Sequence, residues 1–196
     1  RATALGYSAL LAQNPATATN TYNTAVGYEA GLYVSTGVNN TLIGGQAGDA
    51  ITASNDNVAV GTAALTTNTL SSENVAIGRS ALQELNHTTA TDGFNTAVGS
   101  DAGKAVTTGL RNVIIGGLAG TAYTDADKNV AIGFSALKSD TKGDRSVAIG
   151  HDALQAQNFT TVTTTYNVAV GYAAGLYLTT GIQNTLIGAN AGDAIT

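Results

Sequence analysis

Hydrophobic and polar residues recur along the chain in one short block, Asn-x-Ala-(Val/Ile)-Gly-x-x-Ala-(Leu/Gly). Clear copies start at nine asparagines: Asn23, Asn40, Asn57, Asn74, Asn95, Asn112, Asn129, Asn167 and Asn184. Two further copies, around Gly6 and Gly150, lack the asparagine. Successive block glycines are 21, 17, 17 and 17 residues apart, so four intervals build a 72-residue super-repeat. Such a short, regular period is typical of solenoid architectures.

The 17-residue interval favours β-structure over helices. A helical repeat needs about 33 residues, and a glycine in every block would destabilise a helix by about 1 kcal/mol per copy. One coil with two short strands and two turns fits the length, and successive coils pair through parallel hydrogen bonds about 4.8 Å apart. The sequence therefore predicts an all-β, parallel β-solenoid or β-roll of about eleven coils, roughly 50 Å long.

The repeat runs through the whole chain, so residues 1–196 are predicted to form one continuous array. The super-repeat units lie near 6–77, 78–149 and, in part, 150–196. Residues 23–52 and 167–196 match closely, and the first of these copies continues into another coil. Solenoids need capping units, and neither end of this chain resembles one. We expect the chain to be a fragment of a longer fibre.

The residues around each block glycine predict which way the strand faces. Thr or Val lies three residues before the glycine, and Leu, Val or Ile lies one residue before it. These two positions share a face of the strand, and β-branched side chains pack well there. They are predicted to fill the interior of the coil, and the Ala three residues after the glycine is predicted to occupy a tight corner. The Asn column is expected to form a hydrogen-bonded ladder.

The residue between those two positions is predicted to face outward. It is small or apolar in every copy, and an extended apolar stripe implies burial against another chain. Identical stripes on identical chains make self-association the simplest explanation. The predicted homo-oligomer interface consists of Ala25, Leu42, Ala59, Ala76, Ala97, Ile114, Ala131, Ala148, Ala169 and Leu186.

Composition then excludes several functions. A net charge of −5 with eight Lys and Arg residues argues against a nucleic-acid surface, and no apolar run approaches the ~18 residues of a membrane helix. There is no Cys for a zinc-thiolate site, and His87 and His151 occupy different repeat positions. Acidic residues do not recur in pairs. No catalytic, cofactor or metal site is predicted, so the chain is not expected to be an enzyme; incidental calcium at Asp125–Asp127 is left open.

Four-residue insertions are the most individual feature of the chain. They lie in 11–22, 83–94 and 155–166, and each leads to an aromatic residue, Tyr22, Phe94 or Tyr166. Lengthened loops often carry binding residues, and these would recur at every fourth coil. One reading makes them a row of weak glycan or receptor contacts that gain affinity from multivalency. The other reading has the loops cover the rod, with the aromatic rings packed on it.

The blocks resemble the β-roll head repeats of trimeric autotransporter adhesins, and they are more similar still to repeats of phage tail fibres and related surface proteins. Residues 129–133 and 146–150 carry the nearest adhesin-like blocks, and residues 23–31 and 167–175 carry the tail-fibre form Asn-x-Ala-Val-Gly-Tyr. The resemblance spans the whole chain. It implies a left-handed β-roll, a homotrimer, and an extracellular place on a virion tail fibre or a bacterial cell surface.

Together these observations lead to one expected function and an alternative. The first is a non-enzymatic, rigid spacer segment of a tail fibre or surface adhesin, with a second and third copy of the chain as its partners. The alternative is that the segment itself binds host cell-surface glycan or a receptor through its insertion loops. A polysaccharide depolymerase would need clustered acids, which the sequence does not provide.

Overall fold

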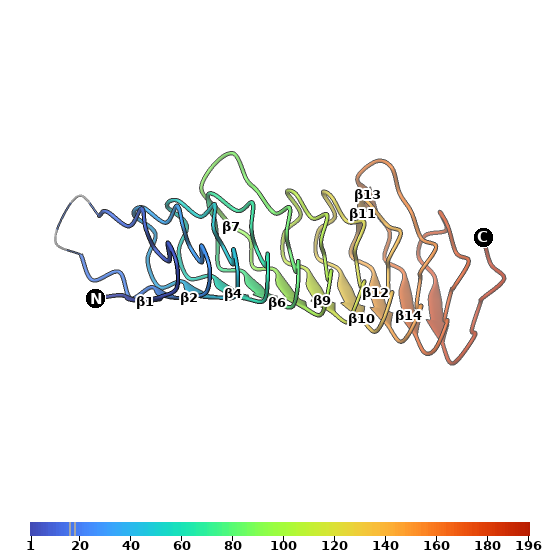
Figure 1. Cartoon of the computed structure of the whole chain (residues 1–196). Helices are drawn as coiled ribbons and strands as arrows, with labels where there is room; N and C mark the ends of the chain where they lie inside the picture. Colours follow the sequence, from blue (N-terminus) through green and yellow to red (C-terminus); the bar gives the residue numbers. More distant parts are fainter. Residues whose placement is uncertain (16, 18) are drawn as a thin grey trace.

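The structure, a computed structural model, describes residues 1–15, 17 and 19–196. The described chain is an all-β rod without helices, and its coils follow each other from one end to the other (Figure 1). Eleven three-residue strands form one parallel sheet: β1 (Thr3–Leu5), β2 (Thr24–Val26), β3 (Thr41–Ile43), β4 (Val58–Val60), β6 (Val75–Ile77), β8 (Thr96–Val98), β9 (Val113–Ile115), β10 (Val130–Ile132), β12 (Val147–Ile149), β14 (Val168–Val170) and β15 (Thr185–Ile187). The predicted parallel β-solenoid of about eleven coils is confirmed.

Two small sheets accompany the second and third long coils. Strand β5 (Ser71–Ser72) pairs with β7 (Thr91–Asp92), and β11 (Gly143–Asp144) pairs with β13 (Thr163–Thr164). These pairs lie on the side of the rod opposite the large sheet, where the loops next to β7 and β13 project (Figure 1). The insertions therefore lengthen one side of the coil without disturbing the sheet.

The strands align one block with the next, so equivalent residues stack along the rod. Ala25 pairs with Leu42, and Leu42 pairs with Ala59. Hydrogen bonds continue around the corners, as from the Leu10 amide to the Ala30 carbonyl at 3.0 Å. Because most of the coil is bonded to the next coil and not only its strands, each column of the repeat forms a straight, rigid line.

The block glycine is required by the close approach of neighbouring coils. Gly61 has a φ of +133°, and a Cβ atom at this position would lie 2.6 Å from the carbonyl carbon of Gly78. Any side chain there would collide with backbone, which cannot move aside without breaking the coil-to-coil pairing. The same close approach recurs at ten of the eleven block glycines, and Gly188 in the last coil shares only the positive φ, +124°.

The predicted facing of the strands is wrong. The middle column lies inside the coil, where Ala25, Leu42, Ala59, Ala76, Ala97, Ile114, Ala131, Ala148 and Ala169 are fully buried and Leu186 is partly buried. The Thr/Val and Val/Ile columns on either side face outward. The coil is so narrow that its interior accepts mostly alanine at this level, and the larger β-branched residues are placed outside. The column proposed as the chain-to-chain interface is thus part of the chain's own core.

Volume is balanced between two interior columns, which explains the large residues in the middle one. Most coils with Ala in the middle column carry a Leu four residues after the block glycine, as Leu65 and Leu82 do. In coils with a glycine there instead, Leu42 fills the space: a Cβ atom at Gly31 or Gly48 would lie 2.7 Å from its methyl groups. Core packing near crystal density requires such compensation.

The Asn ladder is confirmed. The side-chain oxygen of Asn23 accepts hydrogen bonds from the backbone amide and the side-chain amide of Asn40, at 2.8 and 3.2 Å. The same pattern repeats at successive coils through Asn57, Asn74, Asn95 and Asn112. These buried amides satisfy the backbone at the turn before each strand, so the column has a structural role.

Candidate interaction surface

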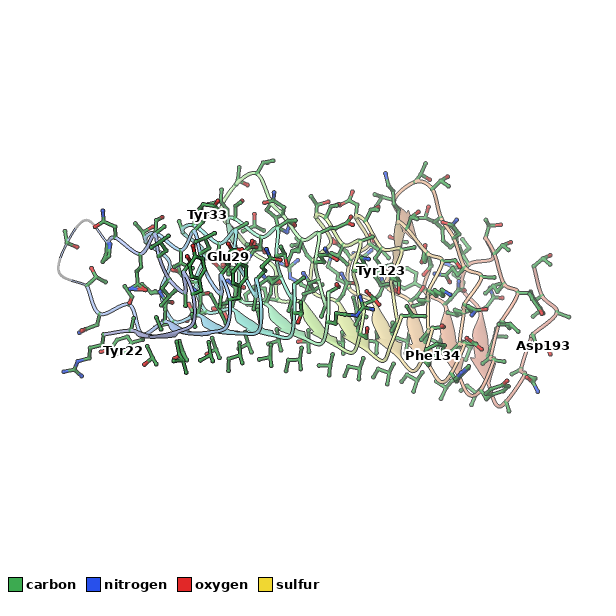
Figure 2. The ribbon with its side chains drawn as sticks, in the orientation of Figure 1. Tyr22, Glu29, Tyr33, Tyr123, Phe134 and Asp193 are labelled. Atoms are coloured by element: carbon green, nitrogen blue, oxygen red, sulfur yellow. The ribbon has the colours of Figure 1, made fainter. Side chains whose placement is uncertain are left out.

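The outer face of the large sheet is the longest regular surface of the molecule. It presents two columns of side chains, Thr or Val at the start of each strand and Val or Ile at its end. Ile43 and Ile77 are each 38% exposed, and Ile115 and Ile149 are each 37% exposed. Figure 2 shows these side chains as a line of short branches along the underside of the strands. Six strands start with Val and five with Thr, and every strand ends with an aliphatic residue, so the face is mainly apolar; no segment of the described chain covers it.

One edge of this face is formed by the residue directly before each Asn position, which we call the edge row. Its members from the second coil to the eleventh are Tyr22, Asn39, Asp56, Glu73, Phe94, Arg111, Lys128, Arg145, Tyr166 and Gln183. All of them have φ between 50° and 61°. Backbone amides lock the row to the previous coil, as from Asp56 to the Val38 carbonyl at 3.1 Å. The side chains point to solvent from fixed positions.

The aromatic residues of the insertions are members of this edge row. Tyr22 and Tyr166 are each 55% exposed and Phe94 is 50% exposed. They lie beside the large sheet, and the loops that precede them project from the other side of the rod (Figure 1). The rings are therefore separated from the insertion loops, and the expectation that they act together with those loops has no support. Part of the first insertion, residues 16 and 18, lies outside the described residues.

The opposite edge of the face carries a second set of exposed rings. Tyr7 stacks on Tyr28 with ring centroids 5.6 Å apart, and His151 stacks between Phe134 and Tyr172 at 5.2 and 5.6 Å. The His151 Nδ1 atom lies 2.8 Å from the Asp152 carboxylate. Consecutive coils hold these rings face to face, yet Tyr7, Tyr28 and Tyr172 are each more than half exposed, so this edge also presents aromatic surface to solvent.

The most concentrated group of buried polar residues lies inside the rod and is structural. The Asp140 carboxylate accepts hydrogen bonds from the Gln157 side chain at 2.6 Å and from the amides of Gly143 and Phe159 at 3.0 and 3.1 Å. Burial raises the pKa of Asp140, although these hydrogen bonds oppose the shift. Nearby, burial raises the pKa of the fully buried Tyr123 hydroxyl, and the charges of Asp140 and Asp144 act in the same direction. A substrate cannot reach any of these groups.

The histidine of the second insertion does not point to chemistry either. His87 is buried, and burial lowers its pKa against the opposing effect of Asp127 and Asp125. Asp125 accepts a hydrogen bond from the Thr108 hydroxyl, and Asp127 accepts one from the Leu110 amide, each at 2.8 Å. Across the described residues, no group of three His, Asp or Glu side chains is placed to hold a metal ion. The calcium alternative at Asp125–Asp127 gains no support from this geometry.

Two further results complete the description. Within the described part of the chain, no helix is long and apolar enough to cross a membrane. In comparisons with protein-family models, curated proteins and solved structures, nothing matches this chain.

Proposed function

We propose that the chain is a non-enzymatic, rigid spacer segment of an extracellular attachment fibre, either a phage tail fibre or a bacterial surface adhesin. The observation that carries the proposal is the continuous outer face of the eleven-stranded sheet, supported on coils that are hydrogen-bonded to each other along the rod. A solenoid bonded from coil to coil resists bending, and its length can be changed by adding or removing units.

The outer face is proposed as the contact between copies of the chain, in place of the middle column. Eleven strands at about 4.8 Å give a strip roughly 50 Å long and roughly 10 Å wide, or about 500 Å². This is at the upper end of the largest apolar patch on a typical monomer. Parallel copies in register would bury equal columns of Val and Ile against each other. Three copies around one axis follow the resemblance to trimeric adhesin heads.

Light scattering combined with small-angle X-ray scattering in about 1 M salt tests this proposal, because apolar contacts persist when charges are screened. A rod with the mass of three chains is expected. Ile77→Asp combined with Ile115→Asp should reduce the mass to one chain and leave the circular dichroism unchanged. Thr88→Asp, in an exposed loop, is the matched control and should remain associated. A wild-type chain that stays monomeric at micromolar concentration contradicts the proposal.

A second candidate is that this segment itself binds glycan, which the exposure of Tyr22, Phe94 and Tyr166 favours. Aromatic rings in the edge row recur every four coils, so a repeating polysaccharide could contact several at once and gain avidity. The test replaces all three by Asn, because Asn39 already occupies the same backbone conformation. Loss of binding on a glycan array with an unchanged melting temperature supports glycan binding. Unchanged binding, or none in the wild type, favours the spacer.

A further inference from the structure

The edge row separates its charges by sign. The four members from Tyr22 to Glu73 include the acidic Asp56 and Glu73, and the next four include three basic residues, Arg111, Lys128 and Arg145. Among the described residues, Asp56, Glu73 and Arg111 form no salt bridge within the chain. In a protein with 11% charged residues, this row gathers five charged residues; the Asn39 amide donates to Asp56 at 2.9 Å, and Lys128 lies near Asp127.

The order of residues in the row is complementary to its own reverse. Counting outward from Phe94 by one coil at a time, Glu73 corresponds to Arg111, Asp56 to Lys128, and Asn39 to Arg145. Four coils out, Tyr22 corresponds to Tyr166. Because the coils stack at a constant spacing, each pair lies at equal distances on either side of Phe94.

From this complementarity we infer that two copies of the chain pair side by side and antiparallel through the edge row, with a two-fold axis at Phe94. Such an isologous contact sets each acidic residue of one copy against a basic residue of the other, and it does so twice. Phe94 then meets its own counterpart, and Tyr22 meets Tyr166 of the second copy. A parallel, in-register contact between two rows would instead place Asp56 against Asp56 and Arg111 against Arg111, which is repulsive.

In the basic half of the row, Arg111 and Lys128 are exposed and Arg145 is partly buried. Lys128 Nζ is 4.0 Å from Asp127 Oδ2, at the limit of an ion pair, and both groups are partly exposed. Asp144 is buried, and it accepts a hydrogen bond from the Asp127 amide at 2.8 Å. The Arg145 guanidinium lies 5.9 Å from the centre of the Tyr166 ring, and its Nη1 atom donates to Thr164 at 2.8 Å. These contacts hold Arg145 extended along the row.

The pairing goes beyond the proposed spacer role and uses a different surface, so the two can be tested separately. In about 1 M salt the mass of the chain reports the association through the apolar face, whether one or three copies. Lowering the salt to about 20 mM should double the mass of a single chain if the edge rows pair, and should raise the mass of a three-chain rod to twice its value or more, because each copy presents one row and exposed charge pairs are then little screened. A mass that does not change with salt contradicts the pairing and leaves the spacer proposal untouched.

Charge exchange tests whether the row is responsible. Asp56→Lys with Glu73→Arg makes the row basic throughout and should weaken the low-salt pairing by about tenfold or more, since four charge pairs are lost. Adding Arg111→Glu and Lys128→Asp restores complementarity in reverse order and should restore the pairing. If the fourfold variant stays unpaired while its melting temperature equals that of the wild type, the inference is wrong.

Single cysteines test the direction of the pairing, because the chain contains no cysteine of its own. Phe94→Cys lies on the two-fold axis and should give a dimer at low salt when a short bifunctional maleimide, which alkylates both thiols and spans more than a disulfide does, is added. Asn39→Cys alone lies off the axis and should not, whereas Asn39→Cys together with Arg145→Cys should. Equal cross-linking of the two single variants would show parallel rows and overturn the inference, as would a lack of cross-linking at Phe94→Cys.

Discussion

Residues 23–94 and 95–166 form four coils each and align position by position, yet they are stabilised differently inside. In the first unit Ile51, Ser54 and Asn68 are buried in the part of the coil away from the large sheet. In the second unit Tyr123, Ala126 and Asp140 occupy the equivalent positions. The Asn68 amide donates to the Ser71 carbonyl at 2.7 Å, whereas Asp140 needs the Gln157 side chain as a donor. One backbone thus tolerates a neutral and an ionisable interior.

The two units also differ in how the Asn ladder ends. Asn74 continues the ladder into the second unit, since its side-chain oxygen accepts the Asn95 amide at 3.2 Å. At the equivalent place Ser146 interrupts it, and Gln157 bridges the gap by donating to Ser146 at 3.0 Å and accepting from Asn167 at 2.8 Å. The comparison shows that the repeat conserves hydrogen-bond satisfaction and not residue identity.

The equivalence of the units can be tested most severely by deletion. Removing residues 23–94 joins Tyr22 to Asn95, which reproduces the native Phe94–Asn95 junction in the edge row. A folded rod shorter by about 19 Å is expected, because each coil contacts only its neighbours.

Removing nine residues, 100–108, should abolish folding, since it breaks the coil and exchanges inward and outward faces. Circular dichroism melts show whether each variant folds, and small-angle X-ray scattering measures the length of the first. A cooperative wild-type melt for the nine-residue deletion would refute the solenoid register.

Core truncation compares the two units at their large middle-column residues. Leu42→Ala should destabilise the chain by about 3 kcal/mol, because the neighbouring glycines leave a cavity that the backbone cannot fill. Ile114→Ala should cost less, since the Tyr123 ring lies against Gly120 and can cover part of the space. Urea unfolding at one protein concentration measures both. Ile43→Ala on the outer face is the control. Its free energy of unfolding, measured for a single folded chain, should stay within about 1 kcal/mol of the wild type. An equal loss for Leu42→Ala and Ile43→Ala would contradict the facing of the strands.

Exchange of the ladder residues gives a smaller effect with a predicted asymmetry. Asn74→Ser should cost about 1–3 kcal/mol, because the shorter side chain leaves the buried Asn95 amide without its acceptor. Ser146→Asn should change stability by less, since Gln157 and Thr165 already satisfy that position. Thermal unfolding of the two variants beside the wild type decides the matter. Equal losses would mean that the second unit relies on the ladder as much as the first.

The repeat, its parallel pairing and the number of coils could be predicted from the sequence because a fixed period directly reports stacking. The facing of the strands could not, because the rule that β-branched residues lie inside assumes a wide core. A signal was present, however. Leu42, Ile114 and Leu186 occur only beside glycines such as Gly48, Gly120 and Gly192, and this exchange of volume marks the two columns as neighbours in one interior.

The candidate surfaces were less predictable. The positions of Tyr22, Phe94 and Tyr166 in the sequence single them out, but the sequence alone groups them with the insertions that precede them. Only the coil geometry shows that they belong to a row with Asp56 and Lys128, each 17 or 21 residues from its neighbour in the row. Charge complementarity within that row becomes visible once the chain is read by columns instead of along its length.

The smallest expected effect concerns the ionisable interior of the second unit. Burial raises the pKa of Asp140 in the folded chain above the value it has when unfolded, so the folded state holds its proton more tightly. Stability is therefore favoured at acidic pH and falls as the pH rises from about 4 through the raised pKa. Asp49 and Asp144 are shifted in the same direction, also chiefly by burial, and add to the slope.

Converting this position to the form of the first unit should flatten the slope. Asp140→Asn together with Ser146→Asn and Gln157→Leu reproduces Asn68, Asn74 and Leu85. It should keep stability at pH 7 within about 1 kcal/mol of the wild type, since an asparagine then continues the ladder that Gln157 bridges in the wild type. The melting temperature of the wild type should fall more between about pH 4 and pH 7.5 than that of the variant, because the loss begins at the pKa of the unfolded carboxyl. Asp92→Asn, an exposed carboxylate, is the matched control and should keep the wild-type slope. If the wild type gains stability over this range, or the variant keeps the full slope, the buried carboxylate is not the group that distinguishes the two units.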